Sequence, residues 1–269
     1  MIQPRKTFAQ HWLKSEKALN EIIRAAQLKA GDRVLEIGPG TGILTRRLLA
    51  EVQSLVAVEI DRDLCDLLAK QLGLKENFLL LQGDFLSLDV TSLLQAFPVF
   101  QKPNKVVANI PYNITGPILE KLLGTIAQAN PEPYELIVLL VQKEVAQRLA
   151  AKAGSTAFGA LSVRVQYLAE CELIYTVPAA AFYPPPKVDS AVVRLVPRQI
   201  LPPVDARRLD TLVKLGFGAK RKMLRNNLQS VVERDLLTEL LEKLDINPQV
   251  RAEDLSVEQW ISLANQLSW

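Results

Sequence analysis

Cysteine and histidine are scarce in this chain, and that scarcity argues against several kinds of chemistry. Among 269 residues there are two cysteines, Cys65 and Cys171, and one histidine, His11. The cysteines lie far apart and in no metal-ligand spacing, so the sequence indicates neither a disulfide framework nor a metal site. We assign no catalytic base role to a lone histidine without a serine, cysteine or spaced ligand as its partner. A reducing cytoplasm fits this composition.

Long hydrophobic runs are also missing. The longest clean apolar run, Leu136 to Val141, is far shorter than the roughly 18 to 20 residues that span a bilayer. The first residues, Met1 to Lys17, are polar and basic and contain no apolar segment typical of a signal peptide. Because 49% of the residues are hydrophobic, the chain can bury a sizeable core. We therefore expect a globular cytoplasmic protein with no membrane partner.

Acidic residues are absent between Asp210 and Glu233, although the net charge of the whole chain is only +3. That interval contains Lys214, Lys220, Arg221, Lys222 and Arg225, and a second basic cluster near the amino terminus contains Arg5, Lys6, Lys14 and Lys17. A single basic cluster is usually a solvated face. Two such clusters flanking a substrate-binding edge favour RNA as the partner, because phosphate contacts supply most non-specific affinity.

A strand, a glycine turn and a helix are predicted at residues 33–37, 38–42 and 43–50. Glycines let a ligand approach the backbone, so this unit suits a nucleotide-like ligand. The next predicted strand, Leu55 to Ile60, places Glu59 about 20 residues after the turn, where a carboxylate usually accepts ribose hydroxyls. Asp84 follows a further apolar segment at residues 78–81. The G-x-G-x-x-G signature is incomplete and no P-loop is present, so the pattern favours S-adenosylmethionine over NAD. Two polar strand ends that face water are the alternative.

The stretch Asn109-Ile110-Pro111-Tyr112 follows a buried apolar run, Lys105 to Ala108. It is therefore expected on the carboxyl edge of a sheet, next to Glu59 and Asp84, where ligands of open α/β sheets bind. An amide, a proline-fixed turn and an aromatic ring placed there can grip a flat, amine-bearing substrate. A tight turn with a purely structural role is the alternative interpretation.

The remaining segments predict a mainly parallel α/β sheet followed by a small all-α domain. Further helices are expected at residues 15–27, with Ser15 as the cap, and at 142–152 and 161–168; late strands are expected at 172–177 and 191–196. Between these strands, Phe182 to Ser190 contains three prolines and predicts a stiff loop. Pro197 to Asp205 indicates a linker, and four helices are expected at 206–215, 220–228, 236–244 and 257–267. We place the two domains at residues 1–203 and 204–269.

Four motifs in order resemble the ribosomal RNA adenine dimethyltransferases, which depend on S-adenosylmethionine. The motifs are Glu36 to Gly42, Asn109 to Tyr112, Phe182 to Ser190 and Arg221 to Leu228. The resemblance implies a Rossmann-like, seven-stranded methyltransferase sheet and a cofactor without a metal. It implies cofactor contacts at His11, Leu13, Gly38, Glu59, Asp84 and Asn109, and catalytic roles for Asn109, Pro111, Tyr112 and Phe182. The family's arm usually has phenylalanine where this chain has Trp12, and the contact at His11 is expected through its backbone.

The resemblance also implies a reaction, namely dimethylation at N6 of two adjacent adenines in a hairpin loop near the 3′ end of small-subunit (16S) rRNA. The hypothesis is that Asn109 and a backbone carbonyl of Ile110-Pro111 accept hydrogen bonds from N6, while Tyr112 and Phe182 stack the extruded base. A monomer that acts on the assembling small subunit is expected. The alternatives are a large-subunit adenine methyltransferase, an assembly factor that only binds, and an NAD-dependent dehydrogenase. A pyrimidine C5 methyltransferase would need a cysteine at this edge, and neither cysteine follows one of these strands.

Overall fold

The computed structural model describes residues 3–5, 10–198, 205–219 and 221–267. The chain divides into two compact units. Unit 1 comprises Met1–Leu122, Glu132–Ala146 and Glu172–Pro197; unit 2 comprises Leu123–Pro131, Gln147–Cys171 and Arg198–Trp269. Helix α6 (Lys143–Leu149) and strand β7 (Ala169–Val177) each contribute residues to both.

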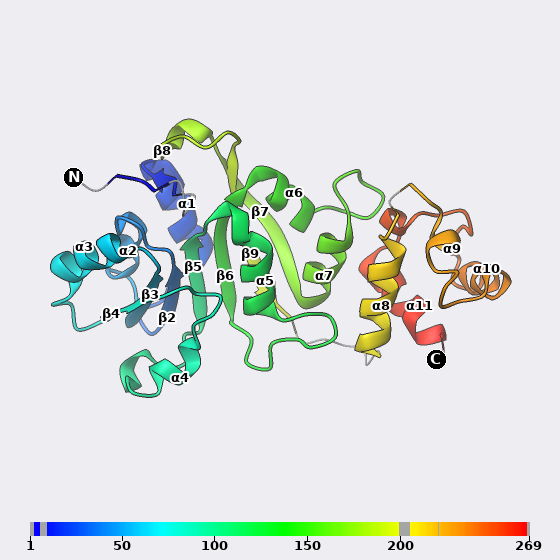
Figure 1. The fold of residues 1–269 in the computed structure, drawn as a ribbon, viewed down its shortest axis with the longest axis horizontal. Helices are drawn as coiled ribbons and strands as arrows, with labels where there is room; N and C mark the ends of the chain where they lie inside the picture. The colour runs from blue at the N-terminus through cyan, green and yellow to red at the C-terminus, as the bar shows by residue number, and fades with distance from the viewer. Residues whose placement is uncertain (1–2, 6–9, 199–204, 220, 268–269) are drawn as a thin grey trace. The chain divides into compact units, whose positions relative to one another are not determined.

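Within the described residues, seven strands form one sheet in the order β4-β3-β2-β5-β6-β9-β7 (Figure 1). The first five strands in that order pair in parallel, whereas β9 is antiparallel to β6. The other bounds are β2 Arg33–Ile37, β3 Ser54–Glu59, β4 Phe78–Gln82, β5 Lys105–Asn109, β6 Leu136–Gln142 and β9 Ser190–Pro197. The predicted seven-stranded, mainly parallel sheet is confirmed.

Parallel strands bring their carboxyl ends to one edge of the sheet, so this topology decides where functional side chains gather. Glu59 is the last residue of β3 and Asn109 the last residue of β5, while Asp84 follows β4 after one glycine. The glycine turn at residues 38–42 joins β2 to α2 at the same edge.

The helices of unit 1 connect these strands. Their bounds are α1 Glu16–Ala26, α2 Ile43–Leu48, α3 Arg62–Leu72, α4 Val90–Leu94 and α5 Thr115–Leu123, with short 3₁₀ turns at η2 Pro98–Phe100, η3 Tyr112–Ile114 and η4 Ala179–Ala181. Helix α1 begins after Ser15, whose hydroxyl oxygen accepts from the backbone N–H of Ala18 at 3.3 Å, as the sequence predicts.

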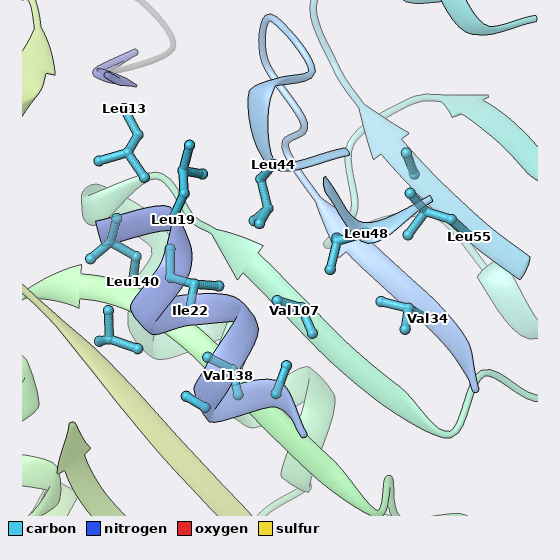
Figure 2. Close-up of a cluster of buried hydrophobic side chains, with 14 of the residues drawn as sticks. Leu13, Leu19, Ile22, Val34, Leu44, Leu48, Leu55, Val107, Val138 and Leu140 are labelled. Carbon is cyan, nitrogen blue, oxygen red and sulfur yellow. The ribbon is translucent and has the colours of Figure 1, made fainter. Parts of the chain in front are cut away.

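Helix α1 packs its apolar face on strands β5 and β6. Leu19 and Ile22 are completely buried, and Figure 2 shows them lying toward Val107, Val138 and Leu140 of the sheet. Burying a side chain of this size stabilises the fold by about 1.5 to 3 kcal/mol. The helix and sheet therefore form one hydrophobic core beneath the strand ends.

A buried ion pair fixes the carboxyl end of α1. The ammonium of Lys105 lies 2.8 Å from Asp32 Oδ2 and donates to the backbone carbonyls of Ala26 at 3.2 Å and Gln27 at 2.6 Å. Both charged side chains are 6% exposed. Burial opposes ionisation, but hydrogen bonds from Lys105 and Asn104 outweigh it and lower the pKa of Asp32.

A two-stranded antiparallel sheet joins the amino-terminal arm to the proline-rich loop. Its strands are β1 (Trp12–Leu13) and β8 (Phe182–Tyr183), with Trp12 opposite Tyr183 and Leu13 opposite Phe182. Leu13 and Phe182 are buried in the core, at 3% and 1% exposure. This pairing holds the arm beside the edge of the large sheet that carries Asn109.

Unit 2 is built from helices around a buried tryptophan. Trp260 is 0% exposed, and a Cβ atom at Gly216 would lie only 2.4 Å from Trp260 Cη2, so only glycine fits there. Within the unit, α8 packs on α7, α9 and α11. The bounds are α7 Ala160–Leu168, α8 Ala206–Gly216, α9 Leu224–Asn227, α10 Arg234–Lys243, η5 Ala252–Asp254 and α11 Val257–Gln266.

The compact units differ from a simple division of the chain at residue 203. Unit 2 includes residues 123–131 and 147–171 in addition to the tail. The expected boundary, most of the expected linker, and the basic residues Lys6 and Lys220 lie outside the described residues. The division into domains at 1–203 and 204–269 therefore remains a prediction. No helix in the described part of the chain is long and apolar enough to cross a membrane.

Candidate functional site

A cavity of about 280 Å³ opens at the carboxyl edge of the sheet in unit 1. Its wall combines four segments that are distant in sequence: the amino-terminal arm at residues 10–13, the glycine turn with β2, the strand ends that carry Glu59 and Asp84, and the turn from Asn109 to Ile114. This volume is close to the lower end of the range for small-molecule pockets, about 300 to 1,000 Å³, and the cavity lies where α/β sheets bind their ligands.

The glycine turn approaches the Asn109 turn closely. Gly38 has φ +67° and a Cβ atom there would lie 3.8 Å from Pro111 Cδ, so the two loops form one continuous wall. Gly40 has φ +59°, and its backbone N–H donates to Glu59 Oε2 at 3.1 Å. Positive φ values of this kind favour glycine, which explains why the turn needs glycine at both positions.

Glu59 is held rigidly by backbone donors on both carboxylate oxygens. In addition to the bond from Gly40, its Oε1 accepts from the backbone N–H of Asp61 at 3.0 Å. Burial raises the pKa of Glu59, and these backbone hydrogen bonds oppose the rise. The carboxylate is therefore fixed in one orientation at the cavity wall.

A second buried carboxyl, Glu36 of β2, also lines the cavity. It is 1% exposed, and its Oε2 has no hydrogen-bond partner among the described residues. Burial raises the pKa of Glu36 to about 8, and the neighbouring charge of Glu59 adds to the rise. Without a ligand the carboxyl is therefore protonated at neutral pH, and a cationic ligand group beside its unpartnered oxygen would favour the ionised form.

Asp84 presents one carboxylate oxygen to its own loop and leaves the other available. Its Oδ1 accepts from the backbone N–H of Leu86 at 2.9 Å. The ammonium of Lys121, on α5, stabilises the same loop. It donates hydrogen bonds to the backbone carbonyls of Phe85 at 2.6 Å, Leu86 at 3.1 Å and Leu88 at 2.7 Å. It also lies 4.9 Å from the centre of the Phe85 ring. This cluster fixes the part of the cavity wall that carries Asp84.

Asn109 lies at the end of β5 with its amide held by the arm. Its Nδ2 donates to the backbone carbonyl of His11 at 3.4 Å. No hydrogen bond to Asn109 Oδ1 occurs within the described residues, so this oxygen is available to accept from a substrate amine. Asn109 therefore contacts the amino-terminal arm through Nδ2 and presents Oδ1 as a hydrogen-bond acceptor at the cavity.

Tyr112 is oriented by contacts on its hydroxyl and on its ring. The hydroxyl forms a 2.5 Å hydrogen bond with Ser190 Oγ, and the ring stacks on His11 with centroids 5.9 Å apart and planes inclined by 17°. Burial raises the pKa of Tyr112, although the bond to Ser190 opposes this. His11 Nδ1 donates to the backbone carbonyl of Pro184 at 2.7 Å. The histidine therefore has a defined side-chain position between the turn and the proline-rich loop.

Most of the predicted site residues meet at this cavity. It is lined by His11, Leu13, Gly38, Glu59, Asp84, Asn109, Pro111 and Tyr112. Phe182 is the exception, because it is 1% exposed and belongs to the hydrophobic core. A stacking role for Phe182 stays a prediction that requires its ring to leave this position, and Tyr183, at 50% exposure, is the accessible aromatic ring of β8.

Several cavity residues were not among the predicted site residues, and two of them, Glu36 and Trp12, contribute buried polar atoms to the cavity wall. Glu36 interrupts an otherwise apolar strand, which is the signal that could have identified it. Trp12 Nε1 is a buried donor without a hydrogen-bond partner among the described residues. The described part of the chain contains no group of three or more histidine, cysteine, aspartate or glutamate side chains that could hold a metal ion.

Comparison with known proteins identifies relatives along the whole chain. The model of a family described as ribosomal RNA adenine dimethylase matches residues 1–268. The ribosomal RNA small subunit methyltransferase A of Nostoc sp. (strain PCC 7120) is 75% identical over 268 residues, which cover 99% of each chain.

Two solved structures show the same fold in related enzymes. A dimethyladenosine transferase from Plasmodium falciparum has a TM-score of 0.78 and 27% identity, covering 95% of this chain and 97% of that one. The 23S rRNA methyltransferase ErmE has a TM-score of 0.75 and 27% identity, covering 95% and 99%.

Proposed function

Because the chain belongs to the family of ribosomal RNA adenine dimethylases, we propose that it methylates N6 of two adjacent adenines near the 3′ end of 16S rRNA. The product is N6,N6-dimethyladenosine and the methyl donor is S-adenosylmethionine. The observation that carries the proposal is one cavity that joins the glycine turn, Glu59 and Asp84 to the Asn109 turn. The 75% identical relative, a ribosomal RNA small subunit methyltransferase A, supports the small subunit as the target.

The polar side chains of the cavity wall complement the polar groups of S-adenosylmethionine. Glu59 suits the ribose hydroxyls and Asp84 the adenine edge, in line with the strand-end carboxylates of nucleoside sites. The amino-acid end of the cofactor is a zwitterion, and the wall contains a buried acceptor, Glu36 Oε2, and a buried donor, Trp12 Nε1, both without partners among the described residues. Both charged groups of the cofactor's amino-acid end thus have a complementary atom in the wall.

The protein's part in the chemistry is to position a weak nucleophile. When bound, S-adenosylmethionine supplies an electrophilic methyl group on a sulfonium that leaves as a neutral thioether. The adenine amine is unreactive because its lone pair is delocalised into the ring. Asn109 Oδ1 and a carbonyl of Ile110-Pro111 accept hydrogen bonds from the N6 protons and so direct the lone pair toward the cofactor. Tyr112 stacks the extruded base, which contributes about 1 to 3 kcal/mol.

The partner follows from the family and from the charge pattern. We propose the rRNA of an assembling small subunit as the substrate, a cytoplasmic location and a monomeric enzyme. The basic residues between Asp210 and Glu233 supply phosphate contacts for this RNA. Binding without catalysis is disfavoured because the Asn109 turn and the cofactor cavity occur together.

Methyl transfer from labelled S-adenosylmethionine tests the proposal. Unmethylated small subunits and, separately, large-subunit RNA are incubated with the enzyme and the nucleosides are then analysed. We expect N6,N6-dimethyladenosine in 16S rRNA alone. Label confined to large-subunit RNA would instead indicate a target like that of the 23S rRNA methyltransferase ErmE. Cofactor binding without any transfer would favour an assembly factor.

A further inference from the structure

The indole of Trp12 is an unexplained donor in the cavity wall. Its Nε1 is buried and has no hydrogen-bond partner among the described residues, although Trp12 lines the cavity. A buried N–H that lacks an acceptor costs about 1 to 3 kcal/mol. Since nearly all buried polar groups in folded proteins are paired, an unpaired donor at a ligand cavity indicates that the ligand supplies the acceptor.

The position of this donor is fixed by the surrounding backbone. Trp12 pairs with Tyr183 across the small sheet, and the next residue, Leu13, is anchored in the core. A Cβ atom at Gly40 would lie 3.4 Å from Trp12 Cδ1 and 3.7 Å from Nε1. The pyrrole edge of the indole, which carries the N–H, therefore faces the glycine turn, where the φ of +59° at residue 40 favours glycine.

The polar groups of the cavity wall indicate which group of the ligand accepts the hydrogen bond from Trp12. Three carboxyl groups line the cavity, at Glu36, Glu59 and Asp84, and each suits a ligand donor such as an ammonium, a hydroxyl or an amine. An indole N–H can only donate, and its strongest partner is an anion. S-adenosylmethionine carries a single anionic group, the carboxylate of its amino-acid end.

We propose that Trp12 Nε1–H is the hydrogen-bond donor for the cofactor's carboxylate. This assignment rests on the proposed function, since it assumes that the cavity takes S-adenosylmethionine. It adds a cofactor-binding side chain from the arm and pairs it with Glu36, whose unpartnered oxygen accepts from the adjacent ammonium. Trp12 Nε1–H then contacts the carboxylate, and Glu36 Oε2 contacts the ammonium, of the same amino-acid group.

The test compares two product-like ligands that differ in this group. S-adenosylhomocysteine retains the carboxylate, whereas 5′-methylthioadenosine retains only the nucleoside and the thioether. Binding of each is measured calorimetrically to the wild-type chain and to Trp12→Phe, which keeps an aromatic ring and removes the N–H. We expect Trp12→Phe to weaken S-adenosylhomocysteine about tenfold to a hundredfold, as for a charged hydrogen bond. Affinity for 5′-methylthioadenosine should remain within about twofold.

The controls distinguish failure of the Trp12–carboxylate contact from failure of the proposed cofactor. Tyr183→Phe, on the paired strand, also changes one polar atom of an aromatic ring and should leave both affinities unchanged. Equal weakening of both ligands by Trp12→Phe, or no weakening of either, overturns the carboxylate contact. A wild-type chain that binds neither ligand overturns the proposed cofactor instead.

A second measurement works even if Trp12→Phe fails to fold. The chain has three tryptophans, so the indole N–H signal of Trp12 can be resolved by ¹⁵N NMR of the wild-type protein. A new charged hydrogen bond moves this signal downfield with S-adenosylhomocysteine and leaves it in place with 5′-methylthioadenosine. The same shift with both ligands contradicts the assignment.

Discussion

Replacement of Glu36 by glutamine should remove a large part of the pH dependence of stability. The pKa of Glu36 is about 8 in the folded protein, because the carboxyl is buried, and 4.5 in its ordinary state. Between these values the folded protein holds a proton that the unfolded chain has released. The free energy of unfolding therefore falls as pH rises, by about 1.4 kcal/mol per pH unit for this group. Between pH 4.5 and about pH 8 the free energy of unfolding falls by a total on the order of 5 kcal/mol.

Urea denaturation followed by far-UV circular dichroism measures this directly. The wild type and Glu36→Gln are compared without cofactor between about pH 5 and about pH 8. The wild-type free energy of unfolding should fall with pH more steeply than that of the variant, by about 1.4 kcal/mol per pH unit. Glu59, whose pKa is also raised, is present in both proteins, so the difference reports Glu36 together with its interaction with Glu59. Parallel pH profiles would refute the assignment of a proton to Glu36.

Three further substitutions test the contacts that shape the site and the helical unit. Lys105→Met leaves the buried carboxylate of Asp32 without its counter-ion, with hydrogen bonds only from Asn104 and the backbone of Lys29, and should lower the free energy of unfolding by about 3 kcal/mol in a urea titration. Gly216→Ala forces a methyl group against Trp260 and should cost about 1 to 3 kcal/mol, measured by thermal unfolding. Lys121→Met releases three backbone carbonyls of the loop after β4 and should weaken S-adenosylhomocysteine about fivefold in a calorimetric titration.

Matched variants decide what each result means. Gly116→Ala introduces a methyl group into open space in α5 and should be neutral or slightly stabilising, so equal costs at Gly116 and Gly216 would contradict the steric argument. Lys121→Arg retains a donor and should recover part of the lost affinity, whereas a merely structural effect would leave it as weak as Lys121→Met. A loss below about 1 kcal/mol in Lys105→Met would show that the buried pair is not needed.

Most strands of the large sheet could be predicted from the sequence because each contains a short apolar run, and β3, β4 and β5 end at the polar residues Glu59, Gln82 and Asn109. The strand predicted at residues 33–37 has the same bounds as β2, and Glu59, Asp84 and Asn109 meet at one cavity because parallel strands share an edge. In contrast, α9 covers only Leu224–Asn227 of the helix expected at 220–228. Periodic apolar residues there are buried by tertiary packing without extending the helix.

The features that sequence patterns did not predict depend on contacts between distant segments. Strands β1 and β8 pair although they are far apart in the sequence. Each contains only two residues, which is too few for a periodic pattern of apolar residues. The burial of Phe182 follows from that pairing, because its partner Leu13 enters the same core. The stacking of His11 on Tyr112 likewise requires the arm to be in place. Local sequence contains no signal for such contacts.

The central claim is that the Asn109 turn directs an adenine amine to the cofactor in this cavity. The most direct measurement is nucleoside analysis of 16S rRNA after incubation of unmethylated small subunits with labelled S-adenosylmethionine and either the wild type or Asn109→Ala. We predict N6,N6-dimethyladenosine with the wild type, and turnover lower by about a hundredfold or more in a variant that still folds. Equal turnover by Asn109→Ala, or label on an atom other than adenine N6, would contradict the account.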